Sequence, residues 1–123
     1  MKVLIIEDNP VDLKLLCAVL QVNGHQIGTC TSAEGALECI LANKPDVILL
    51  DLNLPGNDGL TLARELRKHA ETDKIPIIAI TAYPHRYPSR ASLAAGCTAH
   101  IVKPINTREL VNQVQAVAGG GPP

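Results

Sequence analysis

Short apolar runs and longer amphipathic segments alternate along the whole chain. The runs lie at residues 3–6, 26–30, 47–50, 75–80 and 99–102, and the second and fifth are the weaker ones. Most are apolar throughout instead of alternating with polar residues, which is typical of strands buried on both faces of a sheet. The pattern therefore predicts five short, buried strands.

The segments between these runs carry helix signals at their ends. Asn9 as the N-cap and Pro10 at the first helical position predict the start of the first helix, and Gly24 lies just past its end. Thr31 with Glu34 has the spacing of a capping box, which predicts the start of the second helix. Each of these helices therefore follows a predicted strand.

Three further helices are predicted in the second half of the chain. Residues 60–70 predict the third helix, and residues 89–95, which follow two prolines and end at Gly96, predict a short fourth one. Asn106 with Glu109 is a capping pair for the fifth helix. The apolar stripe of that helix consists of Leu110, Val114 and Val117.

Five strand–helix pairs in strict alternation predict an α/β protein. Such alternation gives a single, doubly wound, five-stranded parallel sheet with helices on both faces, a (βα)5 arrangement. A chain of 123 residues has room for one domain. We assign residues 1–118 to this domain and the Gly- and Pro-rich residues 119–123 to a flexible tail.

Composition and charge exclude several functions. Lys and Arg total 11 against 12 Asp and Glu, and the net charge of −1 is unsuited to binding nucleic acid or an acidic membrane surface. The chain has no Trp, no Phe and two Tyr, so aromatic stacking surfaces are largely ruled out. The first apolar run is too short for a signal peptide or a membrane span, which predicts a cytoplasmic protein whose cysteines are reduced.

Polar residues suited to chemistry stand directly after the predicted strands. Glu7 and Asp8 follow the first strand, Asp51 the third, Thr81 the fourth and Lys103 the fifth. In a sheet of this kind, ligands bind beyond the carboxyl ends of the strands, near the point where the strand order reverses. We therefore expect three carboxylates, one hydroxyl and one ammonium around a single crevice.

Carboxylates gathered at one point repel one another unless a cation lies among them. Carboxylate oxygens suit Mg²⁺, with Mn²⁺ as the alternative, better than they suit zinc. With such a metal, Asp51 could act as a nucleophile toward a phosphoryl group, while Lys103 neutralises its oxygens and Thr81 donates a hydrogen bond. A simpler interpretation stays open, because Glu7 and Asp8 alone equally fit carboxylates that favour a helix start.

Several short motifs occur in a characteristic order along the chain. They are Glu7-Asp8, the segment from Leu49 to Pro55 with Asp58-Gly59, Thr81-Ala82, Ala95-Gly96 and Lys103-Pro104. In these motifs, and over residues 2 to about 117, the chain resembles a response-regulator receiver domain, the phosphoacceptor module of two-component signalling. The resemblance implies a flavodoxin-like fold.

The resemblance also implies roles for the acidic residues. Asp51 resembles the aspartate that accepts a phosphoryl group from the phosphohistidine of a histidine kinase or histidine phosphotransfer protein. Asp8 and Glu7 resemble the acids that hold Mg²⁺, Asp8 directly and Glu7 partly through water. The backbone carbonyl of Asn53 resembles the third protein ligand of the metal.

Other positions resemble switch and tuning residues of the family. Thr81 and Lys103 resemble the switch hydroxyl and the phosphate-binding lysine, and Pro104 resembles a proline whose preceding peptide is usually cis. His100 stands where the family often has an aromatic residue, so either a smaller, titratable switch or a solvent-facing side chain is expected there. Tyr83 stands at a variable position, and its ring is expected to shield the phosphoryl group from water.

These features predict a phosphorylation-dependent signalling switch, not an enzyme that turns over other molecules. Phosphorylation of Asp51 would alter the surface of the fourth helix, fifth strand and fifth helix for a downstream protein or a separate output domain. The domain is expected to be a monomer or weak homodimer that binds neither nucleic acid nor membranes. The alternative is a receiver-like interaction domain without phosphorylation.

Two other functional classes are disfavoured. A phosphohydrolase resembling haloacid dehalogenases is disfavoured because the candidate nucleophile follows the third strand instead of the first. Nucleotide binding is disfavoured because no Gly-rich loop follows the first strand.

Overall fold

Strands and helices alternate as the sequence predicts. The structure, a computed structural model, describes residues 1–54 and 58–118, so the predicted tail at 119–123 and Pro55 lie outside the described residues. The strands are β1 (Lys2–Ile6), β2 (Gln26–Cys30), β3 (Val47–Asp51), β4 (Ile77–Thr81) and β5 (Ala99–Val102). The helices are α1 (Pro10–Val22), α2 (Ala36–Asn43), α3 (Gly59–Lys68), α4 (Ser89–Ala94) and α5 (Thr107–Ala118).

The strands form one parallel sheet with the order β2-β1-β3-β4-β5. The chain starts in β1, adds β2 on one side and then returns to add β3 to β5 on the other. The strand order therefore reverses between β1 and β3, whose carboxyl ends lie side by side with Ile6 opposite Leu50. This is the topology of flavodoxin-like folds, and it confirms the predicted doubly wound α/β class.

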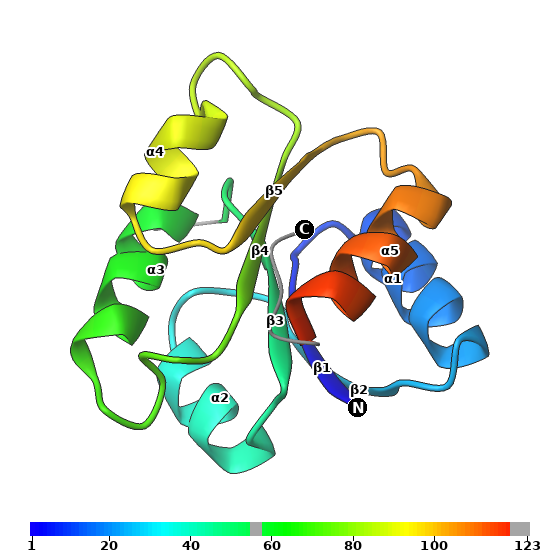
Figure 1. Cartoon of the computed structure of the whole chain (residues 1–123), viewed down its shortest axis with the longest axis horizontal. Helices are drawn as coiled ribbons and strands as arrows, with labels where there is room; N and C mark the ends of the chain where they lie inside the picture. The colour runs from blue at the N-terminus through cyan, green and yellow to red at the C-terminus, as the bar shows by residue number, and fades with distance from the viewer. Residues whose placement is uncertain (55–57, 119–123) are drawn as a thin grey trace.

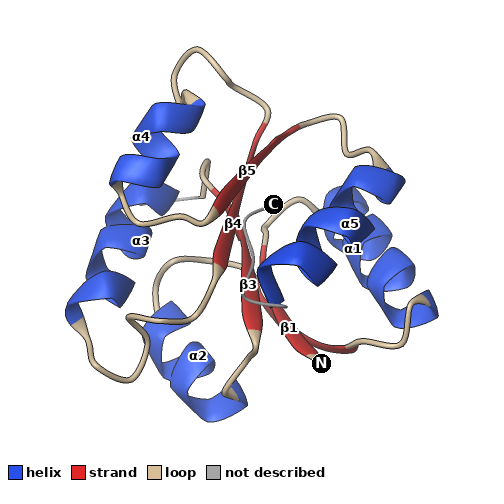
Figure 2. Ribbon diagram, viewed as in Figure 1, coloured by secondary structure: helices blue, strands red, loops and turns tan. Residues whose placement is uncertain are grey.

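Helices cover both faces of the sheet. Helices α1 and α5 pack on one face, and α2, α3 and α4 on the other (Figures 1 and 2). Neighbouring strand residues point to opposite faces, so Val3 and Ile5 belong to the core under α1 and α5, whereas Leu4 and Ile6 belong to the other core. Strands covered on both sides must be apolar at every position, which explains the continuous apolar runs. The predicted stripe of α5, Leu110, Val114 and Val117, is buried in the first of these cores.

The predicted capping box of α2 is wrong. Helix α2 begins at Ala36 instead of directly after Thr31, and its N-cap is Gly35, which makes no side-chain capping bond. A turn precedes the helix because the N–H of Ala36 donates to the carbonyl of Ala33 and Gly35 takes a positive φ of 75°. Glycine adopts this left-handed conformation without the steric penalty of a side chain, so the turn displaces the helix start.

Two other boundaries differ from the prediction. Strand β4 begins at Ile77 and not at residue 75, because the N–H of Ile75 donates to Thr72 in a turn and its carbonyl accepts from Arg67. Helix α3 spans Gly59–Lys68 instead of 60–70, and the side chain of Asp58 caps its start by accepting from the N–H of Thr61 at 2.8 Å. The fourth helix starts at Ser89, as the two preceding prolines predict.

The cysteines and the helix lengths bear on the remaining general predictions. All four cysteines are free, Cys97 buried and the other three half-buried against the two cores. Burial raises the pKa of the Cys97 thiol to about 11, so this side chain packs as a small apolar group. Among the helices of the described residues, none combines the length and the apolar character that a membrane crossing requires.

Candidate functional site

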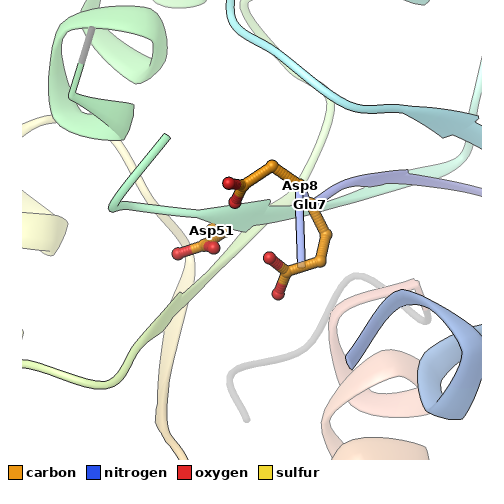
Figure 3. Close-up of side chains that lie close together, drawn as sticks. All are labelled: Glu7, Asp8 and Asp51. Atoms are coloured by element: carbon orange, nitrogen blue, oxygen red, sulfur yellow. The ribbon is translucent and has the colours of Figure 1, made fainter. Parts of the chain in front are cut away.

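The fold brings the three predicted acids to one point at the carboxyl ends of β1 and β3. Asp51 is the last residue of β3, and Glu7 and Asp8 directly follow β1, the neighbouring strand. One carboxylate oxygen from each residue lies within 4.8 Å of the others (Figure 3). Glu7 and Asp51 are 1% and 4% exposed, whereas Asp8 is open to solvent. The three side chains thus form an acidic cluster that is closed at its base and accessible from outside.

Burial without a counter-ion perturbs this acidic cluster. Burial, then a hydrogen bond with Asp51, raises the pKa of Glu7 to about 7, although a hydrogen bond from Lys103 acts in the opposite direction. Glu7 therefore holds its proton to a higher pH than an ordinary carboxylic acid when no metal is bound. Positive charge placed among these carboxylates favours their charged forms.

Lys103, directly after β5, places one positive charge among these carboxylates. Its ammonium donates to Glu7 Oε1 at 2.8 Å and to Asp12 Oδ2 at 2.9 Å, and lies 3.5 Å from Asp51 Oδ2. Burial lowers the pKa of Lys103, but the hydrogen bonds to Glu7 and Asp12 and the charge of Asp51 outweigh burial and raise it overall. Lys103 therefore stays charged. The peptide bond between Lys103 and Pro104 is cis, as the resemblance implies.

Backbone hydrogen bonds order the remaining polar groups of the site. The N–H of Asn53 donates to Asp51 Oδ1 at 3.0 Å, and the N–H of Tyr83 donates to the buried hydroxyl oxygen of Thr81 at 2.9 Å. The N–H of Lys103 donates to the carbonyl of Thr81 at 2.7 Å, which joins the ends of β4 and β5. Thr81 thus uses its oxygen as an acceptor and keeps its hydroxyl proton for another partner.

A mostly polar cleft of about 370 Å³ opens over these groups. It is lined by Asp8, Asn9, Pro10, Asp12, Asp51, Asn53, Ala82, Tyr83 and Lys103. Tyr83 is 52% exposed and belongs to this lining, so it stands at the rim of the cleft.

Gly59 allows α3 to approach the base of the site. A Cβ on Gly59 would lie 2.6 Å from the Cα of Leu52 and 2.8 Å from the carbonyl oxygen of Asp51, closer than any side chain tolerates. The N–H of Gly59 also donates to the carbonyl of Leu52 at 2.8 Å. The Asp58-Gly59 motif is therefore a packing requirement of the strand that carries Asp51.

His100 lies away from the acidic cluster. Its Nδ1 is 2.9 Å from the hydroxyl oxygen of Ser92, a buried residue of α4, and burial lowers its pKa. The ring is half-buried between β5 and α4, so the purely solvent-facing alternative is wrong.

Sequence reasoning missed Asp12. This residue lies in the first turn of α1 and contacts Lys103, which is 91 positions away in the sequence. The available signal was an acidic residue one helical turn beyond the acidic pair, on a helix that starts at the same edge of the sheet.

The donors present fit a hard divalent cation. Three carboxylates offer oxygen ligands within 4.8 Å of one another, and the exposed side of Asp8 leaves room for water ligands. Mg²⁺ prefers oxygen donors and retains several of its waters, so this set suits it well.

Comparison with known proteins identifies the family. The family model for the response regulator receiver domain matches residues 3–115 of the chain. The chain belongs to this family. The receiver domain is also 30% identical over 119 residues to protein PilH from Pseudomonas aeruginosa, a match that covers 97% of this chain and 98% of PilH.

Solved structures show the same fold. A response regulator structure from Chloroflexus aurantiacus superposes with a TM-score of 0.91 at 33% identity, covering 96% of this chain and 97% of the other. The receiver domain of sensor histidine kinase PA1611 from Pseudomonas aeruginosa, solved with a magnesium ion coordinated in its active site cleft, gives 0.87 at 30% identity and the same two coverages, 96% and 97%. Both are relatives at the level of family and fold.

Proposed function

We propose that this receiver domain is a phosphorylation-dependent switch whose phosphoacceptor is Asp51. The donor would be the phosphohistidine of a histidine kinase or a histidine phosphotransfer protein, and the reaction would depend on Mg²⁺. The observation that carries the proposal is the geometry around Asp51: its carboxylate is 4% exposed, lies within 4.8 Å of two other acids, and has the Lys103 ammonium at 3.5 Å. A buried carboxylate with these neighbours suits a nucleophile that works beside a cation.

Glu7, Asp8, Asp51 and the backbone carbonyl of Asn53 would hold the metal. Bound there, Mg²⁺, or Mn²⁺ in its place, would supply positive charge to the carboxylates and to the oxygens of a transferring phosphoryl group. Asp8 is the exposed member of the acidic cluster and would provide the entry side of the site.

The residues of the chain then have distinct tasks in the transfer. An Asp51 carboxylate oxygen forms the new bond to phosphorus, while the phosphorus–nitrogen bond of the phosphohistidine breaks and the imidazole keeps that electron pair. Lys103 balances the charge on the phosphoryl oxygens. Thr81 donates its free hydroxyl proton to one of them, since its oxygen is already occupied by the N–H of Tyr83.

The consequence of phosphorylation would be a changed surface for protein partners. Lys103 and Thr81 stand at the ends of β5 and β4, so movement of either would be transmitted to α4, β5 and α5. The Ser92–His100 hydrogen bond would couple α4 to β5 in this change. Tyr83 would lengthen the life of the phosphoryl group by standing at the cleft rim. Residues 1–118 would act as a receiver domain in the cytoplasm, without turnover of other molecules.

Phosphate uptake measured by intact mass tests the proposal. The protein is incubated with acetyl phosphate or phosphoramidate and Mg²⁺, and a single phosphate adduct that survives acid and is lost in base is expected. Asp51→Asn should abolish the adduct. Asp46→Asn, the same change just before β3 at the opposite end of that strand, should leave it unchanged. Uptake that needs no metal, or that persists in Asp51→Asn, would favour a receiver-like interaction domain instead.

A further inference from the structure

Asp12 makes one of the two hydrogen bonds that hold the Lys103 ammonium. An ammonium has three N–H donors, and two of them go to Glu7 Oε1 at 2.8 Å and Asp12 Oδ2 at 2.9 Å. Asp51 Oδ2 lies further away at 3.5 Å, which leaves the third donor on the side of the phosphoacceptor. Asp12 thus contacts the lysine from α1, whereas Glu7 and Asp51 contact it from the carboxyl ends of strands.

The position of Asp12 is well fixed by the start of α1. The side chain of Asn9 accepts from the backbone N–H groups of both Val11 and Asp12 at 3.0 Å, and Pro10 occupies the first helical turn. The Asp12 side chain is 28% exposed, so it remains partly shielded while it contacts Lys103. A carboxylate held in this way provides a stable reference point for a flexible lysine.

The two other carboxylate partners of Lys103 are the residues expected to turn to a metal. If Glu7 and Asp51 engage a divalent cation, Asp12 remains as the carboxylate that holds Lys103 among the described residues within 4 Å of its ammonium. We propose that Asp12 is a positioning residue that keeps the Lys103 ammonium directed at the phosphoryl group on Asp51. This inference rests on the proposed phosphoacceptor function and assigns a determinant of that site.

The negative charge of Asp12 offers a second, opposite influence on the rate of phosphorylation. Its negative charge lies at the cleft, where it also repels an anionic phosphodonor. If repulsion dominates, removal of the charge accelerates phosphorylation in Asp12→Ala and in Asp12→Asn alike. If positioning dominates, Asp12→Ala is slow, and Asp12→Asn recovers much of the rate because the amide oxygen still accepts from Lys103.

Beryllofluoride with Mg²⁺ serves as the phosphoryl probe, and ¹⁹F NMR reports its contacts. In the full chain, we expect Asp12→Ala to weaken beryllofluoride binding and to slow uptake from acetyl phosphate about tenfold, the size expected for loss of one charge-assisted hydrogen bond. We expect Asp12→Asn to lose about threefold, since a neutral acceptor holds the ammonium less strongly. The ¹⁹F signal of the fluorine nearest Lys103 should shift in Asp12→Ala, a change that a loss of general stability would not produce.

Glu109→Ala is the matched control. Glu109 is an exposed acid in the first turn of α5, so its removal changes the net charge and a helix start without touching Lys103. This variant should bind beryllofluoride and take up phosphate like the parent. The positioning role is overturned if Asp12→Ala behaves like the parent, or if both Asp12 variants become faster.

A measurement without metal or phosphodonor separates this inference from the proposed function. Hydrogen bonds to Glu7 and Asp12 should slow proton exchange enough to make the Lys103 ammonium visible in ¹H–¹⁵N spectra, and Asp12→Ala should remove or broaden that signal. An unchanged signal rejects the Asp12 contact itself. Failure of the parent to take up phosphate, with the signal change present, rejects the function and leaves the contact standing.

Discussion

Lys103 and Arg67 are half-buried cations at opposite ends of the sheet, and their surroundings differ in kind. Lys103 follows β5 and is held by carboxylates. Arg67 comes from α3 and reaches the segments that precede β4 and β5, where its guanidinium donates to backbone carbonyls. Its Nη1 donates to Thr72, Asp73 and Ile75 at 3.1, 3.0 and 2.8 Å, and its Nε donates to Gly96 at 2.9 Å.

The two arrangements have different consequences. The four carbonyls satisfy the Arg67 guanidinium and need no other cation, so these contacts join α3 to the segments before β4 and β5 whether or not a ligand is bound. Gly96 fits this arrangement closely, since it has a positive φ of 105° and a Cβ there would lie 2.5 Å from Arg67 Cγ. Around Lys103, in contrast, the carboxylates exceed the cations, and the excess negative charge is stabilised only when a ligand brings more positive charge.

The largest effect on stability is expected at the Arg67 end. Arg67→Ala removes a donor from four backbone carbonyls, of which that of Thr72 keeps the N–H of Ile75, and should lower the free energy of unfolding by about 3 kcal/mol. Urea unfolding followed by circular dichroism measures this. Arg64→Ala, an exposed position on the same helix, should change stability by less than about 0.5 kcal/mol. Mg²⁺ affinity should stay the same in both variants, and a loss in Arg67→Ala would show that the two ends are not independent.

The second effect is stabilisation by metal at the Lys103 end. Mg²⁺ at about 100 times its dissociation constant should raise the free energy of unfolding by about 2.7 kcal/mol, because it binds the folded state only. The gain should be reduced in Asp8→Asn, which loses one carboxylate of the acidic cluster, and retained in Arg64→Ala. Urea titrations with and without Mg²⁺ measure it. Equal gains in the parent and in Asp8→Asn would place the bound ion elsewhere.

The third effect is a pH dependence of stability that only the metal-free protein should show. The pKa of Glu7 rises from 4.5 to about 7 on folding, so the folded state binds the extra proton between these values. The contribution of Glu7 to stability should therefore be highest near the lower value and fall as pH rises toward 7, with a slope of at most about 1.4 kcal/mol per pH unit for one proton.

Saturating Mg²⁺ should remove this slope, since it favours the charged carboxylate, and Glu7→Gln should remove it without metal. Glu109→Gln, an exposed acid, should preserve it. Urea midpoints measured from pH 4.5 to 7.5 decide the matter. Burial lowers the pKa of His25 and His100, which gives a slope of the opposite sign, so the Glu7 contribution is read from the difference between the parent and Glu7→Gln. Identical metal-free pH profiles in these two proteins would contradict the assigned cause.

The sequence predicted the functional end far better than the Arg67 end, for a physical reason. Five continuous apolar runs indicate strands covered on both faces, and in a parallel sheet the residues after such runs must meet at one edge. Asp51 and Lys103 could thus be placed from their strands alone. Arg67 binds carbonyls, which every residue carries, so no side-chain pattern marks its partners. Asp12 meets Lys103 across 91 positions, so this contact depends on where the fold places the start of α1, and the Thr31 capping box failed because the turn at Gly35 competed with it.

The smallest expected effect distinguishes the two ends most directly. Asp51→Asn removes one of the crowded charges while preserving the shape of the side chain, so metal-free protein near pH 7 should gain about 1 kcal/mol of stability. It should also remove most of the gain from Mg²⁺. Asp46→Asn, at the opposite end of β3, replaces the charged acceptor of the Lys2 N–H at 2.7 Å by a neutral amide oxygen and should be neutral or slightly destabilising. A higher free energy of unfolding in Asp51→Asn would mean that Asp51 lowers the stability of the fold and is retained for its chemistry. A lower free energy of unfolding would instead show that Asp51 stabilises the fold, as Arg67 does.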